Sequence, residues 1–305
     1  MTIEINELKK FFWELQNDIT SKVGEFDGKS FITDEWTKPS DSPLQGNGRT
    51  MLIEKGNFLE RGGVAFSHVS GKKLPPSATS SRPEIAGGQF EAMGVSLVFH
   101  PNNPKVPTVH MNVRCLVVQK EGVEPVWWFG GGMDLTPYYG DVDDCKHFHQ
   151  TCKNTLDAFN KNYYPEFKKN CDAYFYLPHR QETRGIGGIF FDDFSELGFD
   201  QSFAMTQAVG KSLLEAYLPI AKKNVQKPFS PEEKEFQEYR RGRYAEFNLV
   251  YDRGTHFGLQ SGGRTESILM SMPPIARWEY QRPIPPQSPE FQLTDFYLKP
   301  RDWLL

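Results

Sequence analysis

The chain has 305 residues, of which 38% are hydrophobic and 24% charged, so it can form a hydrophobic core and is not disordered throughout. Its 39 acidic residues outnumber 35 Lys and Arg, and the net charge of −4 argues against a general affinity for nucleic acid or anionic membranes. No stretch approaches the ~20 apolar residues of a membrane span, and the amino terminus lacks the pattern of a signal or transit peptide. We therefore expect a cytoplasmic protein with no membrane span and no nucleic-acid partner.

The helix signals fall in four segments. Apolar residues recur at spacings of three and four in residues 1–25, which predicts a helix there. Residues 144–169 and 201–223 follow helical patterns, and Ser230, Pro231 and Glu233 form the capping box of a further helix. Residues 34–47 are rich in Gly, Ser and Pro and predict a loop, and the Pro-rich tail from Pro273 predicts extended chain. With no linker or repeat between these segments, we expect a single domain over residues 1–305.

Strand signals dominate residues 47–118 and 126–194. The clearest strand is Thr108 to Cys115, where polar and apolar residues alternate strictly. Its polar set, His110, Asn112 and Arg114, forms a row suited to gripping an anion, although an ordinary solvent-facing strand has the same alternation. The preceding strand, residues 94–100, alternates as well, and a short connection between the two predicts an antiparallel hairpin. Ser96 and His100 would then join the polar row on one face.

Glycines and arginines gather near these strands. Gly130 to Gly132 precede Asp134, and Gly262 and Gly263 precede Arg264, but no nucleotide-cradling GxGxxG or GxxxxGK[ST] pattern is present. Such glycines either bend strands or let a bulky ligand approach the backbone. Arginine binds carboxylates with two parallel hydrogen bonds, so the residues indicate a pocket for a small anionic ligand on a sheet.

Histidines and cysteines raise the question of a metal. His100, His110, His149 and His179 are dispersed in the sequence and would have to converge in three dimensions. A hydrogen-bonding role for each is the plainer alternative. The four cysteines, Cys115, Cys145, Cys152 and Cys171, contain no CxxC pair, and we expect reduced thiols and neither a zinc site nor disulfides.

Several motifs, taken in order, resemble the oxygen-dependent coproporphyrinogen III oxidase family over nearly the whole chain. They are Val64 to Ser67, Gly94 to His100, His110 to Arg114, Trp128 to Pro137, His179-Arg180, Arg184 to Gly188, Phe190 to Asp193, Tyr244 to Leu249, Asp252 to Thr255 and Ser261 to Arg264. The resemblance implies an α+β fold in which a large antiparallel β-sheet is flanked by α-helices on both faces.

The resemblance also implies an activity. Two propionate side chains of coproporphyrinogen III would be oxidatively decarboxylated to vinyl groups, giving protoporphyrinogen IX, CO2 and H2O2 in haem biosynthesis. Molecular oxygen would be the co-substrate, no organic cofactor would be needed, and the protein would be a homodimer. A divalent metal ion is implied only through bacterial relatives, in which it is held by residues matching His100, His110, His149 and His179.

By position, the resemblance makes His110 the proton donor and Asp134, Arg114 and Arg184 further catalytic residues. Substrate would contact the set Ser96, Asn112, Val113, Arg114, Gly262, Gly263 and Arg264. A carboxylate at Asp134 can accept hydrogen bonds from pyrrole N–H groups, and arginines can anchor propionates. Two alternatives stay open: a His-metal oxygenase or hydrolase acting on an anionic aromatic substrate, and a non-catalytic tetrapyrrole-binding protein.

Overall fold

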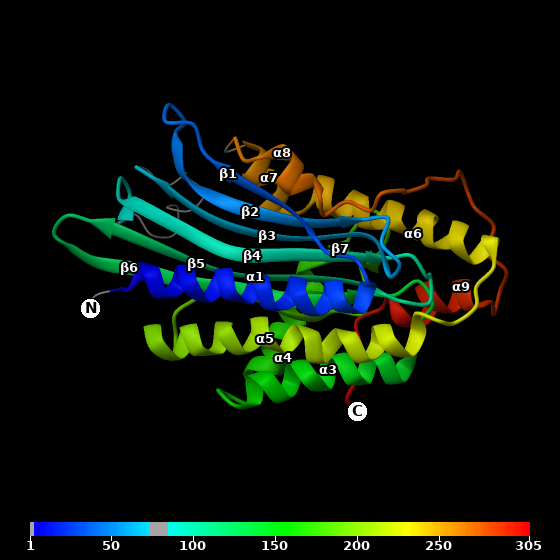
Figure 1. Ribbon diagram of the computed structural model, residues 1–305. Helices are drawn as coiled ribbons and strands as arrows, with labels where there is room; N and C mark the ends of the chain where they lie inside the picture. The colour runs from blue at the N-terminus through cyan, green and yellow to red at the C-terminus, as the bar shows by residue number, and fades with distance from the viewer. Residues whose placement is uncertain (1–2, 73–84, 261) are drawn as a thin grey trace.

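A seven-stranded antiparallel sheet forms the centre of the computed structural model, which describes residues 3–72, 85–260 and 262–305 (Figure 1). Its strands follow one another in chain order except that the last place is taken by β9. They are β1 (Ile32–Thr37), β2 (Leu44–Glu54), β3 (Leu59–Gly71), β4 (Gln89–Pro101), β5 (Thr108–Lys120), β6 (Val123–Thr136) and β9 (Gly188–Phe194). Two short strands, β7 (Tyr176–Leu177) and β8 (Glu182–Thr183), pair separately.

Helices cover both faces of the sheet (Figure 1), as the resemblance implied. On one side lie α1 (Ile5–Asp27), α3 (Val142–Asp157), α4 (Tyr163–Tyr174) and α5 (Phe199–Asn224). On the other lie α6 (Pro231–Val250), α7 (Arg253–Gln260) and α8 (Thr265–Leu269). The expected α+β class is confirmed.

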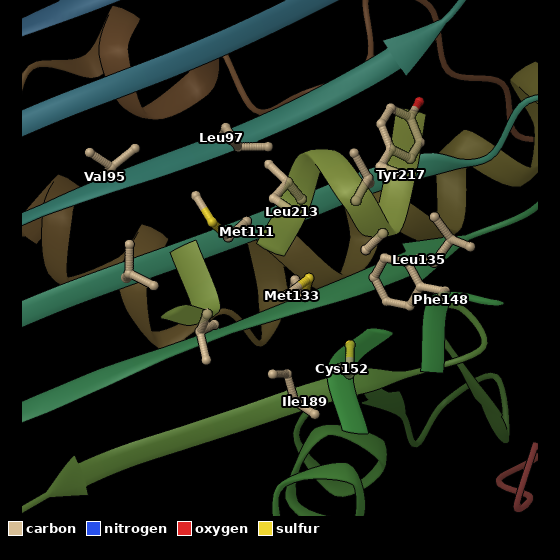
Figure 2. Packing of buried hydrophobic residues seen from close by; sticks show 14 of the residues in the cluster. Val95, Leu97, Met111, Met133, Leu135, Phe148, Cys152, Ile189, Leu213 and Tyr217 are labelled. Carbon is tan, nitrogen blue, oxygen red and sulfur yellow. The ribbon is translucent and has the colours of Figure 1, made fainter. Parts of the chain in front are cut away.

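The hydrophobic core lies between the sheet and the first of these helical layers. Val95 and Leu97 of β4, Met111 of β5 and Met133 of β6 point toward Leu213 of α5 (Figure 2). Alternate strand residues point to opposite faces, so their neighbours along each strand must lie on the other face. This second face carries the polar residues of β4, β5 and β6, and we call it the polar face.

The predicted helix over residues 1–25 and the one beginning at Ser230 are confirmed. The first is α1, which buries Leu8, Phe12, Leu15 and Ile19. At the second, the Ser230 side chain accepts a hydrogen bond from the Glu233 backbone, and the Glu233 side chain accepts one from the Ser230 backbone. The segment 201–223 lies within α5, also as predicted.

The single helix predicted for residues 144–169 is wrong, because the chain forms α3 and α4 with a break between them. Asn160 Oδ1 accepts a hydrogen bond from the Asn162 backbone N–H, a local turn that competes with helix continuation. Pro165 then lies in the first turn of α4, where its missing N–H leaves no helical hydrogen bond unmade.

Two further segments differ from expectation. The loop predicted for residues 34–47 is shorter, because Trp36 and Thr37 pair with Gly48 and Asn47 as the ends of β1 and β2 meet. The tail contains a short helix, α9 (Pro289–Gln292), and a π-helix (Leu293–Tyr297) that packs into the core through Leu293. In the part of the chain that the structure describes, no helix combines the length and apolarity needed to cross a bilayer.

Candidate functional site

The polar face is built from the predicted β4–β5 hairpin. Ser96 of β4 lies opposite Asn112 of β5, and His110 and Arg114 flank Asn112 on the same face. These four side chains are half-buried, whereas Val109, Met111 and Val113 between them are fully buried in the core. The structure therefore brings together the expected residues Ser96, His110, Asn112 and Arg114.

Arg114 is held flat against the sheet by neighbours on both sides. Its Nη1 donates to Asn112 Oδ1 at 2.6 Å, and its Nη2 donates to Asp192 Oδ1 of β9 at 2.7 Å. Gly130 of β6 lies opposite Arg114 in the register and leaves the space that the guanidinium occupies. With its side chain 38% exposed, Arg114 remains open to a ligand above the sheet.

His110, Asp134 and Arg184 form a connected group next to this row. His110 lies opposite Asp134 in the β5–β6 register, and its Nδ1 is 2.8 Å from Asp134 Oδ1. Arg184 Nη2 donates to both Asp134 oxygens at 2.8 Å, and its Nη1 donates to Asn248 Oδ1 of α6 at 2.9 Å. The side chains of Asp134 and Arg184 are each only 2% exposed, while His110 is 22% exposed.

Electrostatics keep Asp134 and Arg184 charged in spite of their burial. Burial alone would raise the pKa of Asp134, but the Arg184 guanidinium and the His110 ring more than offset this and hold the pKa below its usual range. Burial alone would lower the pKa of Arg184, but Asp134 raises it above the usual arginine value. Arg184 also lies over aromatic rings, 4.0 Å from the Phe175 centroid and 4.6 Å from the Tyr244 centroid.

Because Asp134 is ionised, it can only accept, so the Nδ1 of His110 carries the hydrogen of their shared bond. That leaves Nε2 as the ring nitrogen available to a ligand. Both Asp134 oxygens already accept hydrogen bonds from Arg184 or His110. A direct contact between Asp134 and pyrrole N–H groups would therefore require one of these two partners to move, and the arrangement instead favours a role through His110.

The helices of the second layer bridge the polar face from one edge of the sheet to the other. At the β9 edge, Arg253 at the start of α7 faces Asp192 with 3.6 Å between Nη2 and Oδ2. Toward the other edge, Ser267 of α8 hydrogen-bonds Thr50 of β2 at 2.7 Å, and Met270 packs on the bare backbone of Gly63 in β3. The half-buried polar residues of β4 and β5 lie between these two attachments.

The expected substrate residues Gly262, Gly263 and Arg264 lie at the β1 edge of the sheet. Arg264 forms an ion pair with Asp34 of β1, and the Gly262 carbonyl accepts from Lys38. This position is separated from Arg114 by the width of the sheet from β1 to β5, so these residues and Arg114 could contact only different parts of one large ligand. Ser261 of the same motif lies outside the described residues.

Val113 was expected to contact substrate, but its side chain points into the core with Val109 and Met111. Any contact with a ligand on the polar face is thus limited to its backbone. Conversely, sequence reasoning assigned no role to Asp192, Arg253 and Asn248, although all three lie within motifs that carried the resemblance. The two adjacent acids that end the apolar run of β9 were the available signal for Asp192.

The four histidines expected to bind a metal do not meet. His100 is buried between Thr108 Oγ1 at 3.2 Å and the Ser271 carbonyl at 2.8 Å, and His110 contacts Asp134. His149 lies in the other helical layer, where it contacts Tyr164 and the Ile186 carbonyl, and His179 contacts Glu246 and Tyr251. Within residues 3–72, 85–260 and 262–305, no three His, Cys, Asp or Glu side chains are grouped so as to hold a metal ion. The residues present therefore do not fit the four-histidine metal site.

Comparison with known families decides the assignment. The model of the coproporphyrinogen III oxidase family matches residues 7–303. The chain belongs to this family. Coproporphyrinogen oxidases are oxidoreductases of haem biosynthesis that decarboxylate oxidatively, and their substrate is coproporphyrinogen III. The pairing of half-buried arginines with a polar strand face suits such a ligand, because its propionates are carboxylates.

Proposed function

We propose that the chain is the oxygen-dependent type of coproporphyrinogen III oxidase, active as a cytoplasmic homodimer without an organic cofactor. It converts two propionate side chains of coproporphyrinogen III to vinyl groups and forms protoporphyrinogen IX. The observation that carries the proposal is that Arg114 and the His110–Asp134–Arg184 group lie on one face of the sheet. A carboxylate anchor and a proton-carrying group then lie four residues apart on β5, with Asn112 between them on the same face.

Each conversion takes two electrons from the propionate. One side chain, –CH2–CH2–COO⁻, reacts with O2 and one proton to give –CH=CH2, CO2 and H2O2, so the C–COO bond and one β C–H bond break. Oxygen accepts the electrons and one hydrogen from carbon, and the second hydrogen of the peroxide is the added proton. The balance requires an electron acceptor and a proton source.

The protein's own groups are poor electron acceptors. No dinucleotide fingerprint occurs in the sequence, and all four cysteines are buried. Burial raises the pKa of each of these thiols and keeps them protonated, and a free thiol is already reduced, so it accepts no electrons. Molecular oxygen fits this setting because it diffuses to the substrate and needs no binding motif.

Each of these site residues then has a separate role in the reaction. Arg114 binds a propionate through charge-assisted hydrogen bonds and holds it over β5 and β6. His110 supplies the proton from Nε2, and Asp134 fixes the ring by accepting from Nδ1, as acceptors behind catalytic histidines do. Arg184 holds Asp134 in place and keeps it ionised.

A comparison of turnover with and without oxygen tests the proposal. Purified protein is incubated with coproporphyrinogen III in air and under nitrogen, with no added flavin, nicotinamide or haem, and protoporphyrinogen IX and H2O2 are measured. We expect both products in air and neither under nitrogen. Turnover under nitrogen, or inactivity in air until an organic cofactor is added, would contradict the proposal. Porphyrin binding without any turnover would favour a carrier protein instead.

A further inference from the structure

Asp192 places a carboxylate where Arg114 would receive a ligand. Its Oδ1 accepts from Arg114 Nη2 at 2.7 Å, and its Oδ2 lies 3.6 Å from Arg253 Nη2. One aspartate therefore stands between two guanidiniums that come from different elements, β5 and α7. The Arg114, Asp192 and Arg253 side chains are 38%, 32% and 67% exposed, so the group is accessible from solvent.

The backbone of β9 is shaped to point Asp192 at Arg114. Phe129 pairs with Phe194 and Gly131 with Phe191, so Asp192 and Asp193 together oppose Gly130 in a β-bulge. Asp193 has a φ of 51°, and its backbone N–H donates to Asp192 Oδ1 at 3.1 Å. Bulges re-aim side chains beside active sites, and a non-glycine residue in the left-handed region is uncommon. The bulge thus fixes the Asp192 carboxylate over the glycine that gives Arg114 its space.

Arg253 is also held in place by contacts with Tyr174. Its guanidinium lies 4.9 Å from the centroid of the Tyr174 ring, and its backbone N–H donates to the Tyr174 hydroxyl at 3.2 Å. Tyr174 stacks on Phe190 with 4.4 Å between centroids. Phe190 lies two residues before Asp192 and so on the same face of β9. This stack fixes the start of α7 relative to the edge of the polar face.

We propose that Arg253 is a second carboxylate-binding residue and that Asp192 is an internal carboxylate which a substrate propionate replaces. The inference rests on the proposed function, because it takes a propionate of a tetrapyrrole as the ligand. In the free protein the negative charge of Asp192 offsets the repulsion between the Arg114 and Arg253 guanidiniums. A half-exposed ion pair of this kind is weak enough to exchange for a ligand. A propionate that lies between the two guanidiniums can accept hydrogen bonds from both of them, whereas a single arginine would supply only one guanidinium.

The proposal is tested with coproporphyrin III, the oxidised and unreactive form of the substrate, which keeps all its propionates. Its Kd is measured by quenching of tryptophan fluorescence at low and high salt. Arg253→Gln is expected to weaken binding about tenfold through loss of a charged hydrogen bond. Asp192→Asn is expected to tighten binding several-fold at low salt, because it removes the competing charge, and the gain should shrink at high salt. Asp192→Ala provides a second variant should Asn retain the hydrogen bond to Arg114.

Two matched controls remove a charge from an ion pair that does not involve Arg114. Arg180→Gln removes the partner of Glu246, and Asp295→Asn removes the partner of the exposed Lys299. Both should leave Kd unchanged. If Arg253→Gln has no effect, or if neither Asp192 variant tightens binding, the proposal is overturned, while turnover of coproporphyrinogen III by the wild type would still support the proposed function. A wild type that neither binds coproporphyrin III nor converts coproporphyrinogen III would overturn both.

Discussion

Arg114 lies in the space that a side chain on Gly130 would need. A Cβ built on Gly130 would be 2.7 Å from Cζ and Nη2 of Arg114, closer than real carbon contacts allow. The two residues oppose each other in β5 and β6, so the guanidinium can lie flat only while position 130 has no side chain. Within the glycine run of β6, Gly130 thus leaves the space that the Arg114 guanidinium occupies.

Gly130→Ala should therefore push the guanidinium away from the sheet. We expect kcat/KM for coproporphyrinogen III to fall on the order of 10–100-fold, because a small displacement of a positioning group is enough. Arg114 is half exposed and can move, so the free energy of unfolding should change by no more than about 1–3 kcal/mol. In an Arg114→Ala background the same substitution should have little further effect on turnover. Additive losses in the double variant would show that Gly130 acts by another route.

Arg114→Ala should lower turnover far more than stability, since the opposite face of β5 carries the packing. A lost charge-assisted hydrogen bond is worth about 1.5–3 kcal/mol, or roughly 10–100-fold in kcat/KM. Arg114→Lys should restore little, because an ammonium cannot bind a carboxylate through two parallel hydrogen bonds. Steady-state kinetics and thermal midpoints of both variants check this. Near-wild-type turnover in both would remove Arg114 from the site.

Asp134→Asn should impair both folding and turnover. It leaves the Arg184 charge buried without its partner, which typically costs 3–5 kcal/mol, and it weakens the hold on His110. Asp192→Asn is the matched control for stability, because its pair is half exposed and worth at most about 1 kcal/mol. Chemical denaturation of both variants and kinetics of Asp134→Asn separate the effects. Wild-type turnover in a folded Asp134→Asn protein would contradict the role assigned to the His110–Asp134–Arg184 group.

The ion pair between Asp134 and Arg184 also predicts that the stability of the fold depends on pH. The pKa of Asp134 is lowered in the folded state, so its stabilising contribution is present above the unfolded value of about 3.9 and is lost as pH falls through the folded value. The difference in stability between wild type and Asp134→Asn should therefore be constant at neutral pH and shrink below about pH 4. Equilibrium unfolding across this range measures it, and a difference that grows with acid would have the wrong sign.

His149 should make the protein less stable as the solution becomes mildly acidic. Burial lowers the pKa of His149 to about 3, so only the unfolded chain takes up this proton between about pH 6.5 and 3. The contribution is fully present above pH 6.5 and declines by up to ~1.4 kcal/mol per pH unit below it. Between pH 6.5 and 5, His149→Gln should flatten the decline. Equal slopes in wild type and His149→Gln would contradict this.

Much of the fold could be predicted because its signals are local. The α1 periodicity, the α6 capping box and the strict alternation of β5 are each contained in a few neighbouring residues. The side-chain period of a strand places His110, Asn112 and Arg114 on one face whatever else the chain does. The break between α3 and α4 was missed because an apolar pattern continued through a short polar turn.

The site itself was decided by contacts between distant segments. The register of β5 and β6 places Asp134 opposite His110, and a bulge in β9 directs Asp192 toward Arg114. Neither the register nor the bulge can be predicted from the sequence of one strand alone. Burial then separates residues that look alike in the sequence, since His100 and His149 become enclosed hydrogen-bonding groups while His110 stays accessible. The sequence by itself determined which side chains lie on the polar face of each strand. Only the tertiary structure decided which of them touch, because pairing across strands depends on the packing of the whole sheet.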